Sequence, residues 1–175
     1  ARAATQALEA QEQAEQLAQW QIVHNEIHRQ SPTPDDPLSN LAGWNSSYTG
    51  QPIPVTEMRA WVENTVAQIK ALNPKRVLEI GCGSGLLLLR LAPTCERYWG
   101  TDFAEAALAG LQQQVARLAL PHVSLFQKFA DDFTGIEPGS FDVIILNSVI
   151  QYFPNADYLL RVLEGAVRAL APGGT

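Results

Sequence analysis

The chain has 175 residues, of which 46% are hydrophobic, and a formal net charge of −6 at pH 7. This length supports one hydrophobic core, and no stretch approaches the ~20 apolar residues that a membrane span needs. The acidic balance argues against DNA and RNA as partners, because nucleic-acid binders gather Lys and Arg on one face.

Two cysteines, Cys82 and Cys95, show neither metal-ligand spacing nor the density of a secreted disulfide scaffold. We therefore expect a reducing cytoplasm and no metal site. The chain does not start with Met, and its first residues already have a helical composition, so we expect a piece of a longer protein.

Residues 1–37 are predicted to form a helix and a Pro-rich linker. The helix has a thin apolar stripe at steps of three and four residues, typical of a solvated linker or docking helix. The stripe consists of Ala3, Ala7, Ala10, Ala14 and Leu17. Three prolines in SPTPDDP, residues 31–37, end the helix because proline fixes φ and lacks an amide donor.

Residues 38–74 are predicted to form an irregular segment, rich in polar and aromatic residues, and then a helix. Thr56 is the expected cap of this helix. Its apolar face is predicted to carry Met58, Trp61, Val62, Ile69 and Leu72.

Residues 75–175 alternate short apolar strands with amphipathic helices. The predicted strands are 76–80, 97–101, 123–128 and 141–147, and the predicted helices are 85–92, 104–119 and 156–170. This alternation predicts an α/β, Rossmann-like core with a parallel sheet flanked by helices. Its ligand should lie beyond the carboxyl ends of the strands.

The stretch VLEIGCGSG places Gly81, Gly83 and Gly85 directly after the first strand, with Glu79 ahead of them. This G-x-G-x-G spacing differs from the G-x-G-x-x-G of dinucleotide sites. An acid at the loop would also repel a pyrophosphate, so the loop favours a cationic ligand over NAD. The alternative explanation of the glycines is a tight strand-to-helix turn without a ligand.

Acidic residues follow the second and third strands. Asp102 can accept both hydroxyls of a ribose, and Phe103 offers an apolar face for adenine, although Asp102 can also cap the next helix. After the third strand, the Ala130 amide and the Asp131 carboxylate can meet an adenine edge, or they can form a solvated turn.

These motifs, together with GTDF, FDVIILNSVIQYFP and LAPGG, resemble the class I S-adenosylmethionine-dependent methyltransferases. WNSSYTGQPIP and NSVIQYFP resemble more narrowly the methyltransferase domains of nonribosomal peptide and polyketide synthases, over residues 38–174. The resemblance implies that S-adenosylmethionine is the cofactor. It also implies that residues 79–85, including Cys82 and Ser84, wrap the methionine moiety, that Asp102 holds the ribose, and that Ala130 and Asp131 meet adenine.

The loop after the fourth strand is where acceptor and methyl group should meet. Asn147 and Ser148 are predicted to line the cofactor, and Gln151 and Tyr152, the candidate catalytic residues, the acceptor. Val149, Ile150 and Phe153 have a plain structural explanation as the packing of a short helix. Tyr48, in the irregular segment, is predicted to fold over the cofactor as a lid.

A hydroxyl acceptor needs a general base, whereas an amine with a pKa around 8 attacks once it is deprotonated. Three histidines are candidates for the base. His122 starts the third strand, at the wrong end of the sheet, and is interpreted as structural. His24 and His28 lie on one helix face at i and i+4, and we interpret them as exposed, without a catalytic role.

The resemblance implies a methyltransferase domain that acts on an intermediate tethered to a carrier protein, beside other assembly-line domains. We narrowly prefer oxygen over nitrogen as the acceptor. A nicotinamide-dependent reductase and an inert cofactor-binding scaffold are the alternatives. In this family LAPGGT leads into a fifth strand of seven, so we expect the C-terminal strands to be missing and the fourth to be an apolar edge.

Overall fold

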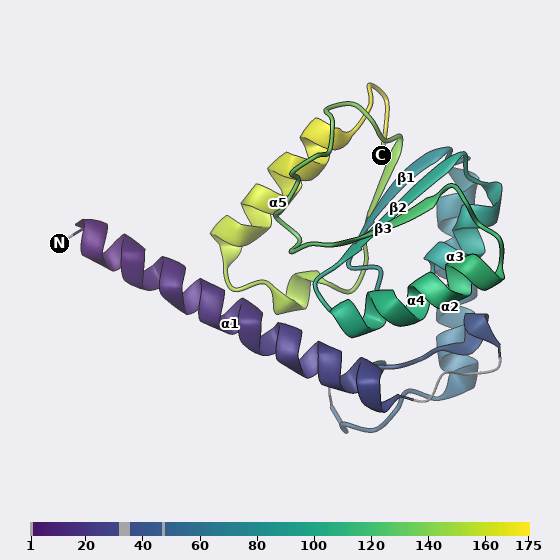
Figure 1. The fold of residues 1–175 in the computed structure, drawn as a ribbon, viewed down its shortest axis with the longest axis horizontal. Coiled ribbons are helices and arrows are strands. Elements are labelled where there is room, and N and C mark those ends of the chain that lie inside the picture. Colours follow the sequence, from purple (N-terminus) through teal and green to yellow (C-terminus); the bar gives the residue numbers. More distant parts are fainter. Residues whose placement is uncertain (1, 32–35, 47) are drawn as a thin grey trace.

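The structure is a computed structural model that describes residues 2–31, 36–46 and 48–175 (Figure 1). Its sheet is parallel and has the order β3-β2-β1-β4. The strands are β1 (Arg76–Ile80), β2 (Arg97–Asp102), β3 (Val123–Gln127) and β4 (Val143–Leu146). The α-helices are α1 (Arg2–Gln30), α2 (Val55–Ala71), α3 (Leu88–Leu91), α4 (Glu105–Arg117) and α5 (Ala156–Ala169). The predicted α/β class, a parallel sheet flanked by helices, is confirmed.

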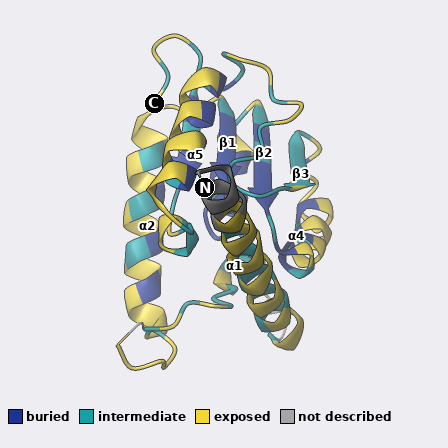
Figure 2. Cartoon of the chain, turned by 90° about the vertical axis from the view of Figure 1, so that its left-hand side faces the viewer, coloured by how far each residue is buried: buried dark blue, intermediate teal, exposed yellow. Residues whose placement is uncertain are grey.

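Alternating side chains of the strands supply two separate apolar cores. Val77 packs in a cluster with residues of α2, α3 and α4, whereas Leu78 and Ile80 pack on the other face with Ala169 of α5. Figure 2 shows the consequence, with β1 and β2 buried between helices. Both faces of the sheet are therefore covered, as the continuous apolar strands require.

The parallel order brings four loops to one edge of the sheet. They follow β1 (the glycine loop, residues 81–85), β2, β3 and β4. Since parallel strands end at the same edge, these loops face a common space. We call this the carboxyl edge, and the opposite side, where the strands begin, the amino edge.

Several predicted boundaries are wrong for local reasons. α2 begins at Val55, and the carbonyl of Pro54 accepts from the amides of Glu57 and Met58, so Thr56 lies inside the first turn and is not a cap. α3 begins at Leu88 because Gly85 has a φ of +82°, outside the helical region. β4 begins at Val143, which lies after the predicted start at residue 141.

Two further differences concern packing partners. Phe141 forms an isolated bridge with Leu170, which keeps it out of β4. Leu72, predicted on the buried face of α2, is instead the C-cap residue and is 48% exposed. The end of α2 is thus partly exposed, whereas its middle is buried.

The C-terminal half of α1 docks on the carboxyl edge, and its N-terminal half projects away (Figure 1). The Gln21 amide donates to the carbonyl oxygen of Phe103 at 2.7 Å, and Asn25 Oδ1 accepts from the Ala106 amide at 2.9 Å. Of the two sequence alternatives, the docking helix describes this half. None of the helices in the described part of the chain is long and apolar enough to cross a membrane.

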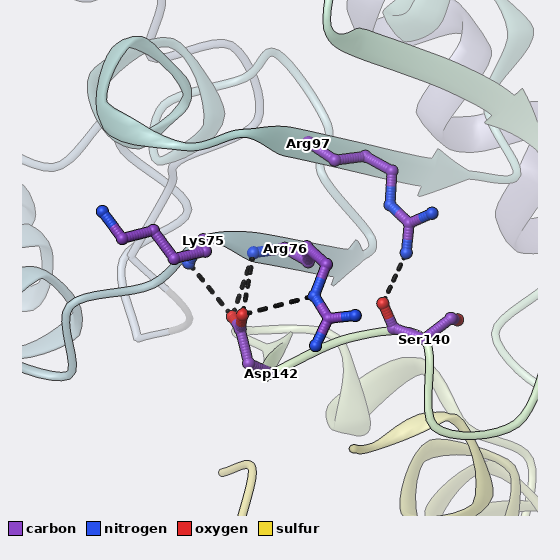
Figure 3. A network of polar contacts seen from close by, with 5 residues as sticks. All are labelled: Lys75, Arg76, Arg97, Ser140 and Asp142. Carbon is purple, nitrogen blue, oxygen red and sulfur yellow. Dashed lines mark hydrogen bonds and ion pairs between the residues drawn. The ribbon is translucent and has the colours of Figure 1, made fainter.

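A compact polar network closes the amino edge (Figure 3). The Asp142 carboxylate accepts from the amides of Lys75 and Arg76 at 3.1 and 3.0 Å and forms an ion pair with Arg76 Nε at 3.6 Å. Arg97 donates to the carbonyl of Ser140. Together these bonds fix the segment before β4 to the starts of β1 and β2.

Candidate functional site

A cavity of about 620 Å³ lies at the carboxyl edge. It brings together most of the residues predicted from the sequence. These are Glu79, Gly81, Cys82, Gly83, Ser84, Asp102, Phe103, Asn147, Ser148, Gln151 and Tyr152.

The three glycines give the glycine loop its shape. Gly81, Gly83 and Gly85 have φ values of +78°, +49° and +82°, which side-chain-bearing residues rarely adopt. The Gly81 amide donates to the Thr101 carbonyl at 2.8 Å, and the Gly83 amide to the Asp102 carboxylate at 2.8 Å. The loop is therefore fastened to the end of β2.

Each glycine faces different surroundings. A Cβ at Gly81 would stand 2.0 Å from Val149 Cγ1, and one at Gly85 would stand 2.4 Å from a Leu111 methyl group. A Cβ at Gly83 would meet no atom within 4 Å. Gly81 and Gly85 thus permit packing, while Gly83 borders the open cavity.

Glu79 is a buried acid at the cavity wall. Its carboxylate accepts a hydrogen bond from the Tyr98 hydroxyl at 2.7 Å. Burial raises the pKa of Glu79 to about 8, an effect that the Tyr98 bond opposes and nearby Asp102 adds to. The carboxyl group therefore carries a proton over part of the neutral range.

Asp102 ends β2, as predicted, and faces the same cavity. Besides the Gly83 amide, it accepts the Ala104 amide at 2.8 Å. Burial raises the pKa of Asp102, while these two bonds lower it. A carboxylate offers about four acceptor positions, so two stay free for a ligand. Asp102 is not the N-cap residue of α4, since that position belongs to Ala104.

The two residues predicted in the third loop, Ala130 and Asp131, lie in different surroundings. Ala130 lines a smaller, apolar cavity of about 40 Å³, which shares Trp20, Asp102 and Phe103 with the larger one. Asp131 lines neither cavity, because it forms an ion pair with Arg161 of α5 at 3.3 Å. This contact gives Asp131 a structural role in place of a free turn.

The loop after β4 supplies another wall of the cavity. Ser148 has a φ of +56°, and Gln151 Nε2 donates to the Ser148 carbonyl at 2.7 Å. Ile150–Tyr152 form a short 3₁₀ turn. Within it Tyr152 packs edge-on against Trp20 and His24, with ring centroids 4.8 Å apart in both cases.

The structure places Tyr48 outside the cavity. Tyr48 is fully exposed in the turn that follows Ser46, while Asn45 pairs with Pro52 across that turn. Its neighbours Trp44, Asn45 and Ser46 line the cavity instead. The irregular segment thus contributes to the site through residues that the sequence did not single out, and a lid role for Tyr48 stays a prediction.

Sequence reasoning missed the contribution of α1. Trp20, His24 and His28 line the larger cavity, and the interpretation of the two histidines as exposed is wrong, since both are half-buried. Burial lowers the pKa of each imidazole, and the nearby Asp102 carboxylate opposes this. The signal was present, because the predicted stripe that ends at Leu17 continues at these positions.

Two further features concern the remaining predictions. His122 Nε2 donates to the Ala92 carbonyl at 2.8 Å, away from the cavity, in agreement with a structural role. Within residues 2–31, 36–46 and 48–175, no group of three or more His, Cys, Asp or Glu side chains is placed to hold a metal ion.

A Rossmann-like sheet with a glycine loop, an acid after β2 and a cavity at the carboxyl edge defines the class I methyltransferase type of α/β domain. Residues 78–175 match the family model described as "Methyltransferase domain". The chain belongs to this family.

Similar proteins extend the comparison. The chain is 52% identical to chondramide synthase cmdD of Chondromyces crocatus over 93% of its length, and 44% identical over 91% to CymA of Salinispora arenicola, described as a probable non-canonical nonribosomal peptide synthetase. It spans only 4% and 2% of these proteins. The chain therefore corresponds to a small part of each synthetase.

Solved structures agree on the fold. The N-methyltransferase NodS of Bradyrhizobium japonicum, in complex with S-adenosyl-L-homocysteine, is 27% identical, with a TM-score of 0.57 over 64% of this chain and 58% of NodS. Phosphoethanolamine N-methyltransferase 1 of Haemonchus contortus is 19% identical and shows the fold alone, with a TM-score of 0.65 over 91% of this chain and 31% of that one.

Proposed function

We propose that this chain is the cofactor-binding part of a methyltransferase domain in a nonribosomal peptide synthetase, and that it directs a methyl group from S-adenosylmethionine to the nitrogen of a tethered aminoacyl group. The observation that carries the proposal is the shared cavity. It joins the glycine loop, Asp102 and residues 147–152 in a chain of the methyltransferase domain family.

The residues present fit the proposed cofactor. Asp102 keeps two acceptor positions free after binding the Gly83 and Ala104 amides, which suits the two hydroxyls of a ribose. At Gly83 there is open space where any other residue would place a Cβ. The cavity of about 620 Å³ falls within the ~300–1,000 Å³ of small-molecule sites.

Each part of the cavity then has a role toward the cofactor. Asp102 would hold the ribose, and Phe103 would face the adenine, which extends toward the smaller cavity and Ala130. Asn147 and Ser148 would line the opposite end, near the methyl group. NodS, whose solved structure holds S-adenosyl-L-homocysteine, supports this choice of ligand.

The cofactor would supply an electrophilic methyl group on a positively charged sulfur. The chain contributes position: Gln151 and Tyr152, beside Asn147, would orient the acceptor lone pair, and the walls of the cavity would exclude competing water. An amine with a pKa around 8 attacks after losing its proton to solvent. No general base is then required of the protein.

Nitrogen replaces, in this proposal, the oxygen acceptor that the sequence narrowly favoured. CymA is described as a peptide synthetase, and NodS is described as an N-methyltransferase. Oxygen stays a prediction that the following experiment tests against nitrogen.

Synthetic aminoacyl and hydroxyacyl thioesters, incubated with the chain and methyl-labelled S-adenosylmethionine, distinguish the acceptors by mass spectrometry. We expect label on the amine. Label on the hydroxyl alone would replace nitrogen with oxygen, and no label beside normal cofactor binding would favour the inert scaffold. Calorimetric titration with NADPH tests the reductase, which predicts binding that S-adenosylhomocysteine does not compete with.

The acceptor wall is tested by Gln151→Ala and Tyr152→Phe. If these residues orient the acceptor, turnover of the aminoacyl thioester falls while affinity for S-adenosylhomocysteine changes little, as for an interaction made mainly in the transition state. Ile150→Ala, an exposed neighbour outside the cavity, is the matched control and should turn over at the parent rate. Parent-rate turnover by both wall variants would place the acceptor elsewhere.

A carrier protein and the neighbouring domains of the synthetase are the proposed partners. They follow from the relatives, which are far longer than this chain. The thioester assay above bears on this point too, because a free amino acid should be a poorer acceptor than the tethered form.

A further inference from the structure

The larger cavity has an unusual balance of charge for the ligand proposed above. Its ionisable side chains include two acids, Glu79 and Asp102, and the only side chains along it that can become cationic, among the residues that the structure describes, are His24 and His28. S-adenosylmethionine carries a carboxylate at its amino-acid end. A buried carboxylate without a donor is costly, so some group of the chain must meet it.

Most amides of the glycine loop are not available as hydrogen-bond donors to this carboxylate. The amides of Gly81 and Cys82 donate to Thr101, that of Gly83 donates to Asp102, and that of Gly85 donates to the Cys82 carbonyl. Four amides that border the methionine end are thus already engaged. A side chain is therefore the stronger candidate for the donor.

Lys128 also borders the site, but it is unsuitable as this donor. It lines the smaller cavity, on the adenine side, and not the larger one. Its ammonium group contacts Asp132 at 3.0 Å and donates to the Thr134 carbonyl at 2.9 Å. Lys128 therefore lies too far toward the adenine, and is already bonded, to bind the carboxylate at the methionine end.

Trp20, His24 and His28 lie on one face of α1, and this face runs parallel to the expected cofactor. Trp20 borders the smaller cavity with Ala130, while His28 borders a pocket that Ser84 of the glycine loop also lines. Eight helical residues rise by about 12 Å, comparable to the length of an adenosyl amino acid. With the ribose at Asp102 and the adenine toward Trp20, the amino-acid end of the cofactor therefore reaches His28.

His28 is also free to bind. Neither of its ring nitrogens has a hydrogen-bond partner in the part of the chain that the structure describes, although the ring is half-buried. A half-buried imidazole that lines a cavity can donate an N–H to a ligand oxygen, and a carboxylate favours its protonated form.

We propose that His28 binds the carboxylate of the cofactor's amino-acid end, so that α1 forms part of the cofactor site. This inference rests on S-adenosylmethionine being the cofactor, but not on the acceptor atom. It makes the docked half of α1 a requirement for full affinity.

The test compares two ligands that differ only in the carboxylate. These are S-adenosylhomocysteine and its decarboxylated amine, S-adenosyl-3-thiopropylamine, titrated by calorimetry into the full chain. His28→Ala should weaken S-adenosylhomocysteine about ten-fold or more, as for a lost charge-assisted bond, and leave the amine within about two-fold. His28→Gln keeps a hydrogen-bond donor, so its affinity for S-adenosylhomocysteine should fall less than that of His28→Ala.

Arg29→Ala is the matched control, because it removes a cation from the same turn of α1 on the exposed side. It should leave both ligands unchanged. Normal binding of the amine by His28→Ala shows that the variant is folded. Equal loss of both ligands in the two His28 variants, or no loss of either, would overturn the proposal. Failure of methyl transfer with this binding pattern intact would instead contradict only the proposed reaction.

Discussion

The two edges of the sheet carry similar side chains but use them differently. At the amino edge, Asp142 is met by the amides of Lys75 and Arg76 and by the Arg76 side chain (Figure 3). At the carboxyl edge, Glu79 and Asp102 face a cavity without a lysine or arginine among its described lining residues. The first edge satisfies its acid inside the fold, and the second leaves its acids with unused capacity.

This difference separates stability from binding. An acid whose acceptor positions are filled by amides and an ion pair contributes mainly to the fold, whereas a buried acid with unused acceptor positions carries a desolvation cost that a ligand can offset. The raised pKa values of Glu79 and Asp102 express that cost. Substitutions of four acids separate the two edges, and their expected effects decrease from Glu79 to Asp131.

Glu79→Gln should have the largest effect, on the pH dependence of stability. The folded chain keeps a proton on Glu79 up to about pH 8, while an unfolded chain releases it near the ordinary value of 4.5. The free energy of unfolding should therefore fall as pH rises through this window, by at most about 1.4 kcal/mol per pH unit. Urea unfolding at pH 5, 6, 7 and 8 measures it.

The Gln variant should show a flatter profile than the parent. Because the pKa values of His24 and His28 are lowered, these residues change stability in the opposite direction, and the difference between the two proteins isolates Glu79. Parallel profiles would mean that Glu79 is ionised in the folded chain. The variant should also bind S-adenosylmethionine more weakly relative to S-adenosylhomocysteine, which lacks the sulfonium charge.

Asp102→Ala should lower affinity for S-adenosylhomocysteine about ten- to a hundred-fold, the worth of ~1.5–3 kcal/mol of charge-assisted hydrogen bonds. Calorimetric titration measures it. The loss of the acceptor for Gly83 and Ala104 should also lower the melting temperature. Unchanged affinity would remove Asp102 from the cofactor site.

Asp142→Ala should lower the stability of the chain and leave its affinity for the cofactor unchanged. Two amides and Arg76 lose their acceptor, so we expect the free energy of unfolding to fall by about 1–2 kcal/mol, with water replacing part of the loss at this partly exposed site. Affinity for S-adenosylhomocysteine, measured below the melting temperature, should match the parent. A drop comparable to that of Asp102→Ala would show that the two edges are not independent.

Asp131→Ala should have the smallest effect, although Asp131 lies in a loop of the carboxyl edge. Its ion pair with the exposed Arg161 is of a kind that contributes about 0.2–1 kcal/mol. Affinity should stay within about two-fold of the parent. The adenine contact predicted from the sequence demands a larger loss, near ten-fold, and titration distinguishes the two.

The sequence predicted the core better than the edges of the site. Strand periodicity and the glycine loop located β1 to within a residue and placed Asp102 at the end of β2, because local pattern and backbone conformation decide these features. Rules for loops placed Gln151 and Tyr152 at the cavity as well.

The features that the sequence did not anticipate come from contacts between residues distant in sequence. Asp131 turns to Arg161, and α1 brings His24 and His28 to a loop that follows them by more than fifty residues. Such docking depends on tertiary packing, which the spacing of residues within one helix does not encode. Tyr48 shows the same limit, since the hairpin-like turn around it decides which neighbour faces the cavity.

The contact between Gly81 and Val149 has a consequence for engineering. Val149 occupies the space that any side chain at position 81 would need, so the glycine loop and the loop after β4 fit as a matched pair. Residues 147–153 of another domain could be transplanted to change the acceptor. The transplant alone should succeed only if the new residue at position 149 packs against Gly81. Where it does not fit, the glycine loop has to be exchanged together with residues 147–153.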